Sequence, residues 1–127
     1  EMTSSLVGSE MCIRDSNITL KPLIARIRPF NINNDVQLLI KAPQDYSFPS
    51  GHTAASFAAV FSLMFAKNKL WKALIVPAFL IAFSRLYLYV HYPSDIFAGI
   101  LVGFISGFLS VILYRTAEKL LHKKGEL

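Results

Sequence analysis

Three long apolar blocks fill most of the second half of the chain. Residues 46–66 and 96–114 contain no Lys, Arg, Asp or Glu, and residues 71–90 are charged only near their two ends. A helix needs about 20 such residues to cross a bilayer. The pattern therefore predicts an all-α fold, a bundle of three transmembrane helices. Buried helices of a soluble bundle are the alternative, which three successive blocks with aromatic ends disfavour.

Three glycines recur in the last block at intervals of four residues: Gly99, Gly103 and Gly107. On a helix this spacing places them in one stripe, where the missing side chains let a second helix approach closely. We therefore expect these glycines to serve helix packing rather than catalysis.

The first part of the chain divides into two segments. Residues 17–48 have helix-like spacing up to Arg28, followed by Pro29 and a loop rich in Asn, Asp and Pro. Residues 1–16 show no clear periodicity and lack the apolar core of a signal peptide. They resemble translated adaptor or vector sequence, so we predict a foreign or disordered leader. A disordered native terminus is the other interpretation.

Composition supports a membrane protein. Hydrophobic residues make up 54% of the chain and its mean hydropathy is +0.46, above the values of ordinary soluble domains. The net charge of +5 comes from residues between and after the apolar blocks, so a nucleic-acid partner is not expected. The single cysteine, Cys12, excludes an internal disulfide and a cysteine-based metal site.

The basic residues that flank the blocks predict an orientation. If three helices alternate in direction, the basic groups after the first and third blocks lie on the same side of the membrane. The positive-inside rule assigns that side, and the C-terminus with it, to the cytoplasm. Residues 49–52 and 84–95 then face outward. The two basic groups are Lys67, Lys69 and Lys72, and Arg115, Lys119, Lys123 and Lys124.

Three cations are predicted to lie at the outward face: Lys21, Arg28 and Arg85. Cations repel one another unless an anion lies among them, and guanidinium groups pair well with phosphate or carboxylate. Ser50 and Gly51 begin the first apolar helix, where free N–H groups also favour an anion. We expect these five residues to bind phosphate. Snorkelling or ordinary flanking charge explains each cation singly, but not their presence on the side that positive-inside bias depletes.

Two histidines, His52 and His91, stand at the starts of the first and third predicted helices. Asp95 lies four residues after His91, which brings the two side chains together on one helical turn. Asp95 can accept the proton of one ring nitrogen and leave the other as a nucleophile. The set suits phosphoryl transfer, with His52 protonating the leaving oxygen. Taken singly, an interfacial histidine or a helix N-terminal aspartate is also common.

These residues form three motifs in order. KPLIARIRP at 21–29 has a lysine, six residues and Arg-Pro, and PSGH occupies 49–52. SRLYLYVHYPSD at 84–95 has Ser-Arg, five residues, His, three residues and Asp. Together they resemble the three signatures of the type 2 phosphatidic acid phosphatase superfamily, with no departure at the defining positions. The resemblance assigns residues 17–127 to a membrane domain of this type.

The resemblance implies a metal-independent lipid phosphatase that forms a phosphohistidine and needs no cofactor. It makes His91 the nucleophile, Asp95 the residue that orients it, and His52 the general acid. The phosphate-binding residues it implies are Lys21, Arg28, Arg85, Ser50 and Gly51.

Within the superfamily, the short connection between the first two motifs most resembles small bacterial undecaprenyl-diphosphate phosphatases of the bacitracin-resistance type. That resemblance implies a multi-pass protein of the bacterial cell membrane with an extracytoplasmic site. Relatives acting on phosphatidylglycerophosphate, phosphatidate or lipid A share the same motifs. Such enzymes have about six spans, so the sequence is interpreted as the C-terminal part of a longer protein. A catalytically silent lipid-binding protein and a transporter segment are the alternatives from other classes.

Overall fold

The computed structural model describes residues 2–125, with their side chains from residue 7 to residue 124. This part of the chain contains five helices and no strand. They are α1 (Met2–Ile24), α2 (Pro29–Ile32), α3 (Gly51–Phe65), α4 (Trp71–Tyr87) and α5 (Pro93–Gly125). Residue 1 of the predicted leader and Leu127, at the predicted cytoplasmic end, lie outside the described residues.

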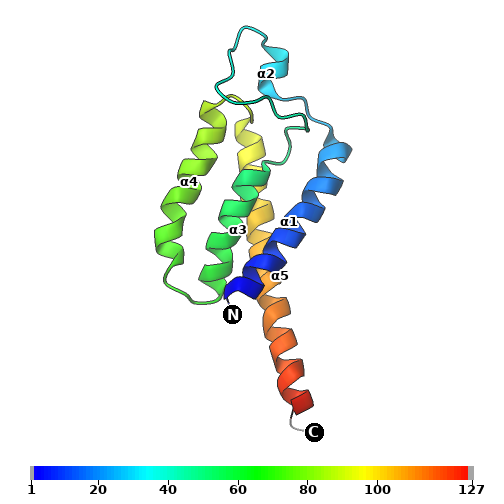
Figure 1. The fold of residues 1–127 in the computed structure, drawn as a ribbon, viewed down its shortest axis with the longest axis vertical. Helices are drawn as coiled ribbons and strands as arrows, with labels where there is room; N and C mark the ends of the chain where they lie inside the picture. The colour runs from blue at the N-terminus through cyan, green and yellow to red at the C-terminus, as the bar shows by residue number, and fades with distance from the viewer. Residues whose placement is uncertain (1, 126–127) are drawn as a thin grey trace.

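Helix α3 lies at the centre of the bundle and packs against α1, α4 and α5 (Figure 1). Its apolar side chains face more than one neighbour, so they form the middle of the hydrophobic core. The main hydrophobic cluster lies between α3, α4 and the start of α5. Its buried members are Phe57, Val60, Ala78, Ala82 and Ile96.

The predicted glycine stripe is confirmed as the contact between α5 and α3. A Cβ atom on Gly99 would lie 2.7 Å from the backbone oxygen of Ser50, and one on Gly103 would lie 2.8 Å from that of Ala54. On Gly107 it would lie 2.9 Å from the backbone nitrogen of Ser62. The two helices are therefore closer than any larger residue at these positions allows.

The apolar blocks coincide with α3, α4 and α5, but their lengths differ. Among the described residues, only α5, over Pro93–Lys124, is long and apolar enough to cross a membrane, and α3 is a shorter apolar helix. The count of three spans therefore stays a prediction. Large apolar side chains on α4 and α5 remain exposed, as in Phe83 and Phe97 at 66% and 73%. Such outer faces suit a lipid surrounding.

Residues 2–16 form the first part of α1, which continues without a break into the segment that carries Lys21. Ile13 is buried in a small cluster with Ala54 and Ala58 of α3. The foreign origin of residues 1–16 remains a prediction, because helix formation and packing do not reveal where a sequence came from.

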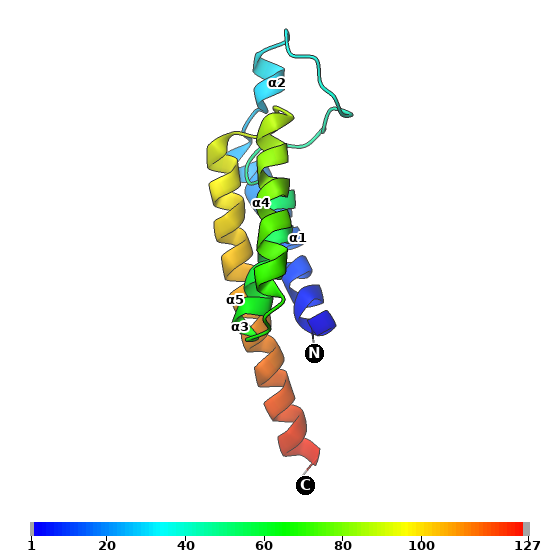
Figure 2. The same cartoon turned by 90° about the vertical axis from the view of Figure 1, so that its left-hand side faces the viewer.

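Four chain segments meet at one end of the bundle. The last turn of α1 and of α4 and the first turn of α3 and of α5 lie there, beneath α2 and its connections (Figure 1). At the opposite end, the final turns of α5 project past the other helices (Figure 2). All three sequence motifs consequently lie at the same end.

Candidate active site

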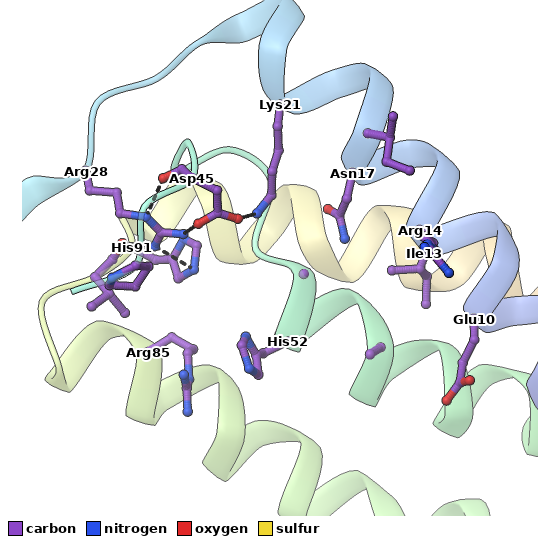
Figure 3. A pocket seen from close by; sticks show the side chains of 15 residues that line it. Glu10, Ile13, Arg14, Asn17, Lys21, Arg28, Asp45, His52, Arg85 and His91 are labelled. Carbon is purple, nitrogen blue, oxygen red and sulfur yellow. Dashed lines mark hydrogen bonds and ion pairs between the residues drawn. The ribbon is translucent and has the colours of Figure 1, made fainter. Parts of the chain in front are cut away.

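A pocket of about 780 Å³ opens at this end of the bundle. Side chains from α1, α3 and α4 and from the connecting segments point into it (Figure 3). Six of the eight predicted site residues line it, and the other two, Ser50 and Asp95, are fully buried next to it. The six are Lys21, Arg28, Gly51, His52, Arg85 and His91.

Arg28 is buried and held in place by several acceptors. Its Nε donates to the backbone oxygen of Asp45 at 2.9 Å, and its Nη1 donates to that of Val90 at 2.8 Å. Its Nη2 donates to the carboxylate of Asp45 at 2.6 Å. The guanidinium therefore has a fixed orientation, and the connection before α3 and the one before α5 are both bonded to it.

Asp45 is a site residue that the sequence analysis missed. Its carboxylate bridges two of the predicted phosphate-binding cations, because one oxygen pairs with Lys21 and the other with Arg28. Burial raises the pKa of Asp45, but the hydrogen bonds and positive charge of Lys21 and Arg28 outweigh burial and hold this pKa below its usual value. The carboxyl group is therefore ionised at neutral pH.

His91 lies between its predicted partner, Asp95, and the guanidinium of Arg28. Its Nδ1 is 3.5 Å from Oδ2 of Asp95, longer than a well-formed hydrogen bond. Its Nε2 is 3.3 Å from Nη1 of Arg28. Contacts of catalytic groups are often long in unliganded sites and tighten when substrate binds.

The contact with Arg28 indicates which nitrogen of His91 carries the lone pair. A guanidinium has only donors, so Nε2 must act as the acceptor when it contacts Arg28. The ring proton of a neutral His91 is then on Nδ1, which faces Asp95. This tautomer leaves a lone pair on Nε2, which lies at the pocket.

Asp95 is fully buried and has partners on both oxygens. Oδ2 accepts hydrogen bonds from the hydroxyl of Ser47 and from the backbone N–H of Tyr92, the latter at 2.8 Å. Oδ1 accepts from Nη1 of Arg26 at 2.9 Å, and the guanidinium of Arg26 lies 4.1 Å from the centre of the Tyr92 ring. Neither Ser47 nor Arg26 was predicted from the sequence as part of the site. These contacts fix the carboxylate against His91.

The N-terminal turn of α3 contributes the remaining predicted residues. Ser50 is fully buried and its N–H donates to the backbone oxygen of Asp95 at 3.1 Å, which joins the starts of α3 and α5. A Cβ on Gly51 would lie 2.9 Å from Nδ2 of Asn17, the flexible end of a side chain of α1. His52 projects into the pocket on the same side as Arg85 (Figure 3).

Arg85, in the last turn of α4, has a buried Nε with no hydrogen-bond partner among the described residues. An unpaired buried donor is costly, so the pocket is arranged for an anion at this point. With an acceptor nitrogen on His91 and cations around it, the arrangement can bind a phosphoryl group and expose its phosphorus to attack.

Comparisons with known proteins find a matching family and several relatives. The family model described as PAP2 superfamily matches residues 2–119. The undecaprenyl-diphosphatase of Sulfolobus acidocaldarius is 42% identical over 97 residues, which cover 76% of this chain and 47% of that protein. The lipid A 4′-phosphatase of Bacteroides thetaiotaomicron is 35% identical over 120 residues, which cover 89% of this chain and 50% of that protein.

A solved structure has the same fold. The transmembrane PAP2-type phosphatidylglycerolphosphate phosphatase of Bacillus subtilis aligns with a TM-score of 0.71 and 26% identity, over 87% of this chain and 58% of that one. The chain spans about half the length of the two curated relatives. The membrane setting of this neighbour and the candidate span in α5 indicate a membrane protein.

Proposed function

The chain belongs to the PAP2 superfamily, and on this basis we propose that it is a lipid phosphatase acting through a phosphohistidine on His91. The observation that carries the proposal is the position of Nε2 of His91. This atom faces the pocket beside Arg28 as an acceptor, while Nδ1 faces the buried carboxylate of Asp95.

In the first step, Lys21, Arg28 and Arg85 bind the oxygens of the terminal phosphoryl group, aided by Ser50 and the N–H of Gly51. Nε2 of His91 attacks phosphorus, and the bond to the leaving oxygen breaks. His52 protonates that oxygen, and Asp95 stabilises the positive charge on the His91 ring.

In the second step, water attacks the phosphohistidine. His52, now without its proton, takes a proton from the water, so the group that acted as acid acts as base. The bond between phosphorus and Nε2 of His91 breaks, its electron pair returns to the ring, and orthophosphate leaves. His91 and His52 are then in their starting states. The protein needs no metal ion in this scheme, because the three cations neutralise the phosphoryl charge.

For the substrate, we propose undecaprenyl diphosphate, which would be converted to undecaprenyl phosphate. The relative with the highest identity among those compared above is named an undecaprenyl-diphosphatase. Lipid A, phosphatidylglycerophosphate and phosphatidate are the alternatives, and the first two occur in the names of the other proteins compared. The proposed setting is the bacterial cell membrane, with the pocket on the extracytoplasmic side.

The test is phosphate release from a panel of these lipids by the detergent-solubilised chain in the presence of EDTA. We expect release from undecaprenyl diphosphate, and His91→Ala should lower the rate by about 10³-fold or more. His122→Ala is the matched control, because His122 is exposed on the far end of α5.

Each contrary outcome is informative. Normal turnover by His91→Ala would contradict the assignment of His91 as nucleophile. Loss of activity in EDTA would contradict the proposal that the enzyme needs no metal ion. Binding of lipid without phosphate release would favour a catalytically silent lipid-binding protein. Substrate flux into vesicles without phosphate release would favour a transporter.

A further inference from the structure

The phosphate-binding cations already hold an anion in this structure. The Asp45 carboxylate has two oxygens, as a phosphoryl group has several, and each contacts a different cation: Oδ1 contacts Arg28 and Oδ2 contacts Lys21 (Figure 3). Asp45 lines the pocket together with both cations. A carboxylate in this position has the same partners that a bound phosphoryl group would need.

The cations and the carboxylate in this contact are buried to different extents. The side chains of Lys21 and Arg28 are 15% and 4% exposed, whereas that of Asp45 is 52% exposed. A half-exposed carboxylate recovers most of its hydration when it leaves, so its departure costs little. The charge of the buried Arg28, and that of the mostly covered Lys21, cannot be left without a counter-charge at similarly low cost. The cations are therefore the fixed part of the contact, and the carboxylate is the exchangeable part.

The backbone around Asp45 is anchored independently of its carboxylate. Nε of Arg28 donates to the backbone oxygen of Asp45 at 2.9 Å, and the N–H of Ser47 donates to the backbone oxygen of Arg26 at 2.9 Å. Rotation about the side-chain bonds can consequently move the carboxylate into solvent while the connection stays in place. Exposed side chains change rotamer within picoseconds to nanoseconds, so this movement is fast.

We propose that Asp45 is an internal competitor of the substrate phosphate, and that it sets how tightly the pocket holds phosphate. The inference deepens the proposed function and rests on it for the identity of the substrate. On binding, phosphoryl oxygens replace the carboxylate oxygens at Lys21 and Arg28, and Asp45 turns outward. After hydrolysis, the carboxylate returns to the same cations and helps to expel orthophosphate.

The return of Asp45 matters for turnover because three cations around one phosphate would otherwise hold the product strongly. Within the described part of the chain, the buried Nε of Arg85 has no carboxylate partner, so Arg85 offers the phosphate its first fixed contact before the exchange. Asp45 is thus a specificity-determining residue, and it favours substrates whose phosphoryl charge exceeds the single charge of a carboxylate.

The first test measures binding of inorganic phosphate to the detergent-solubilised chain by titration calorimetry. Asp45→Asn keeps the size of the side chain and removes its charge, and we expect it to bind phosphate about tenfold more tightly. Asp35→Asn is the matched control, since Asp35 is exposed in the same connection and does not line the pocket. Equal or weaker phosphate binding by Asp45→Asn would overturn the proposal.

A second measurement uses the unmodified chain, so it does not depend on how the variant folds. Carbodiimide labelling of Asp45, read by mass spectrometry, should increase when phosphate is added, while labelling of Asp35 stays constant. Unchanged or reduced labelling of Asp45 would show that the carboxylate does not leave.

The two proposals fail separately in these experiments. If Asp45→Asn binds phosphate more tightly but no lipid is hydrolysed, the competition holds and the phosphatase proposal fails. If lipid is hydrolysed but Asp45→Asn binds phosphate no better, only the competition is wrong.

Discussion

Arg26 acts on the proposed nucleophile through one intermediate residue. It pairs with the buried carboxylate of Asp95, stacks on Tyr92 and does not line the pocket. Removing one partner of such a pair leaves Asp95 buried with less compensation and free to shift away from His91. Arg26 is therefore a positioning residue in the proposed mechanism.

We expect Arg26→Gln to lower kcat for lipid phosphate hydrolysis by about tenfold to a hundredfold while KM changes little. Arg26→Lys should restore part of the loss because it keeps the charge. Lys21→Ala, which removes a pocket cation, should instead raise KM. Steady-state kinetics of the three variants distinguishes these effects, and an equal rise in KM for Arg26→Gln would contradict the positioning role.

Asp45 also makes stability depend on pH. Its pKa is lower in the folded chain than in the unfolded chain, because Lys21 and Arg28 outweigh burial. The ionised carboxylate therefore stabilises the fold above the unfolded-state pKa of about 3.9, and this contribution is lost as pH falls through the lower folded-state pKa.

Asp45→Asn should consequently be less stable than the unmodified chain near neutral pH, and the difference should shrink only below about pH 4. Thermal unfolding of both chains in micelles, from neutral pH to below about pH 4, measures this difference in stability. Asp35→Asn should show no comparable difference, and a gap that widened in acid would contradict the assignment.

At the residue scale, the motifs predicted the groups that line the pocket but not their partners. Lys21, Arg28 and His91 stand at fixed positions in recognisable patterns. Asp45 lies 17 residues after Arg28 in a connection without periodicity, so only the fold reveals their contact. Arg26 lies inside the first motif, but nothing in the sequence shows that it faces Asp95.

Among the elements, the pair formed by α3 and α5 is the most sensitive to side-chain size. A Cβ on Gly103 would lie 2.8 Å from a backbone oxygen of α3, whereas one on Gly8 of α1 would lie 3.5 Å from the nearest atom, in ordinary contact. Backbone atoms cannot move aside as a flexible side chain can, so the whole helix must shift.

We expect Gly103→Ala to destabilise the bundle by about 1–3 kcal/mol, although alanine favours an isolated helix. Gly8→Ala should be neutral or stabilising. Unfolding in mixed detergent micelles measures both variants, and a stabilised Gly103→Ala would show that the helices are not in close contact.

The order of the elements was predictable, while their ends were less so. The apolar blocks at 71–90 and 96–114 correspond to α4 and α5, but α5 runs from Pro93 to Gly125. Its extension follows from strong helix formers after residue 115, where charged residues interrupt the apolar block. The helix over residues 2–16 was missed because that segment lacks an amphipathic pattern, and its packing depends on contacts with α3 and α5.

For the whole molecule, orientation in the membrane is the main prediction. A green fluorescent reporter fused after Leu127 should fluoresce in bacterial cells, because the positive-inside rule places that end in the cytoplasm. The same reporter inserted between residues 34 and 42, at the pocket end, should stay dark after export. Fluorescence from the second fusion alone would show that the chain has the opposite orientation.

Four chain segments meet at one end of the bundle. That end and the opposite end consequently differ in how well they tolerate changes of sequence and length. At the pocket end, each segment is bonded to another, as Ser50 is to Asp95 and Arg28 is to Val90. At the other end, the turn between α3 and α4, around Lys67, connects two helices that are adjacent in sequence, and the hydrogen bond from Arg115 of α5 goes to the backbone oxygen of Phe65, within α3 rather than within the turn. Insertions and sequence drift are therefore tolerated at that turn, where a tag or a split between two fragments leaves the chemistry undisturbed.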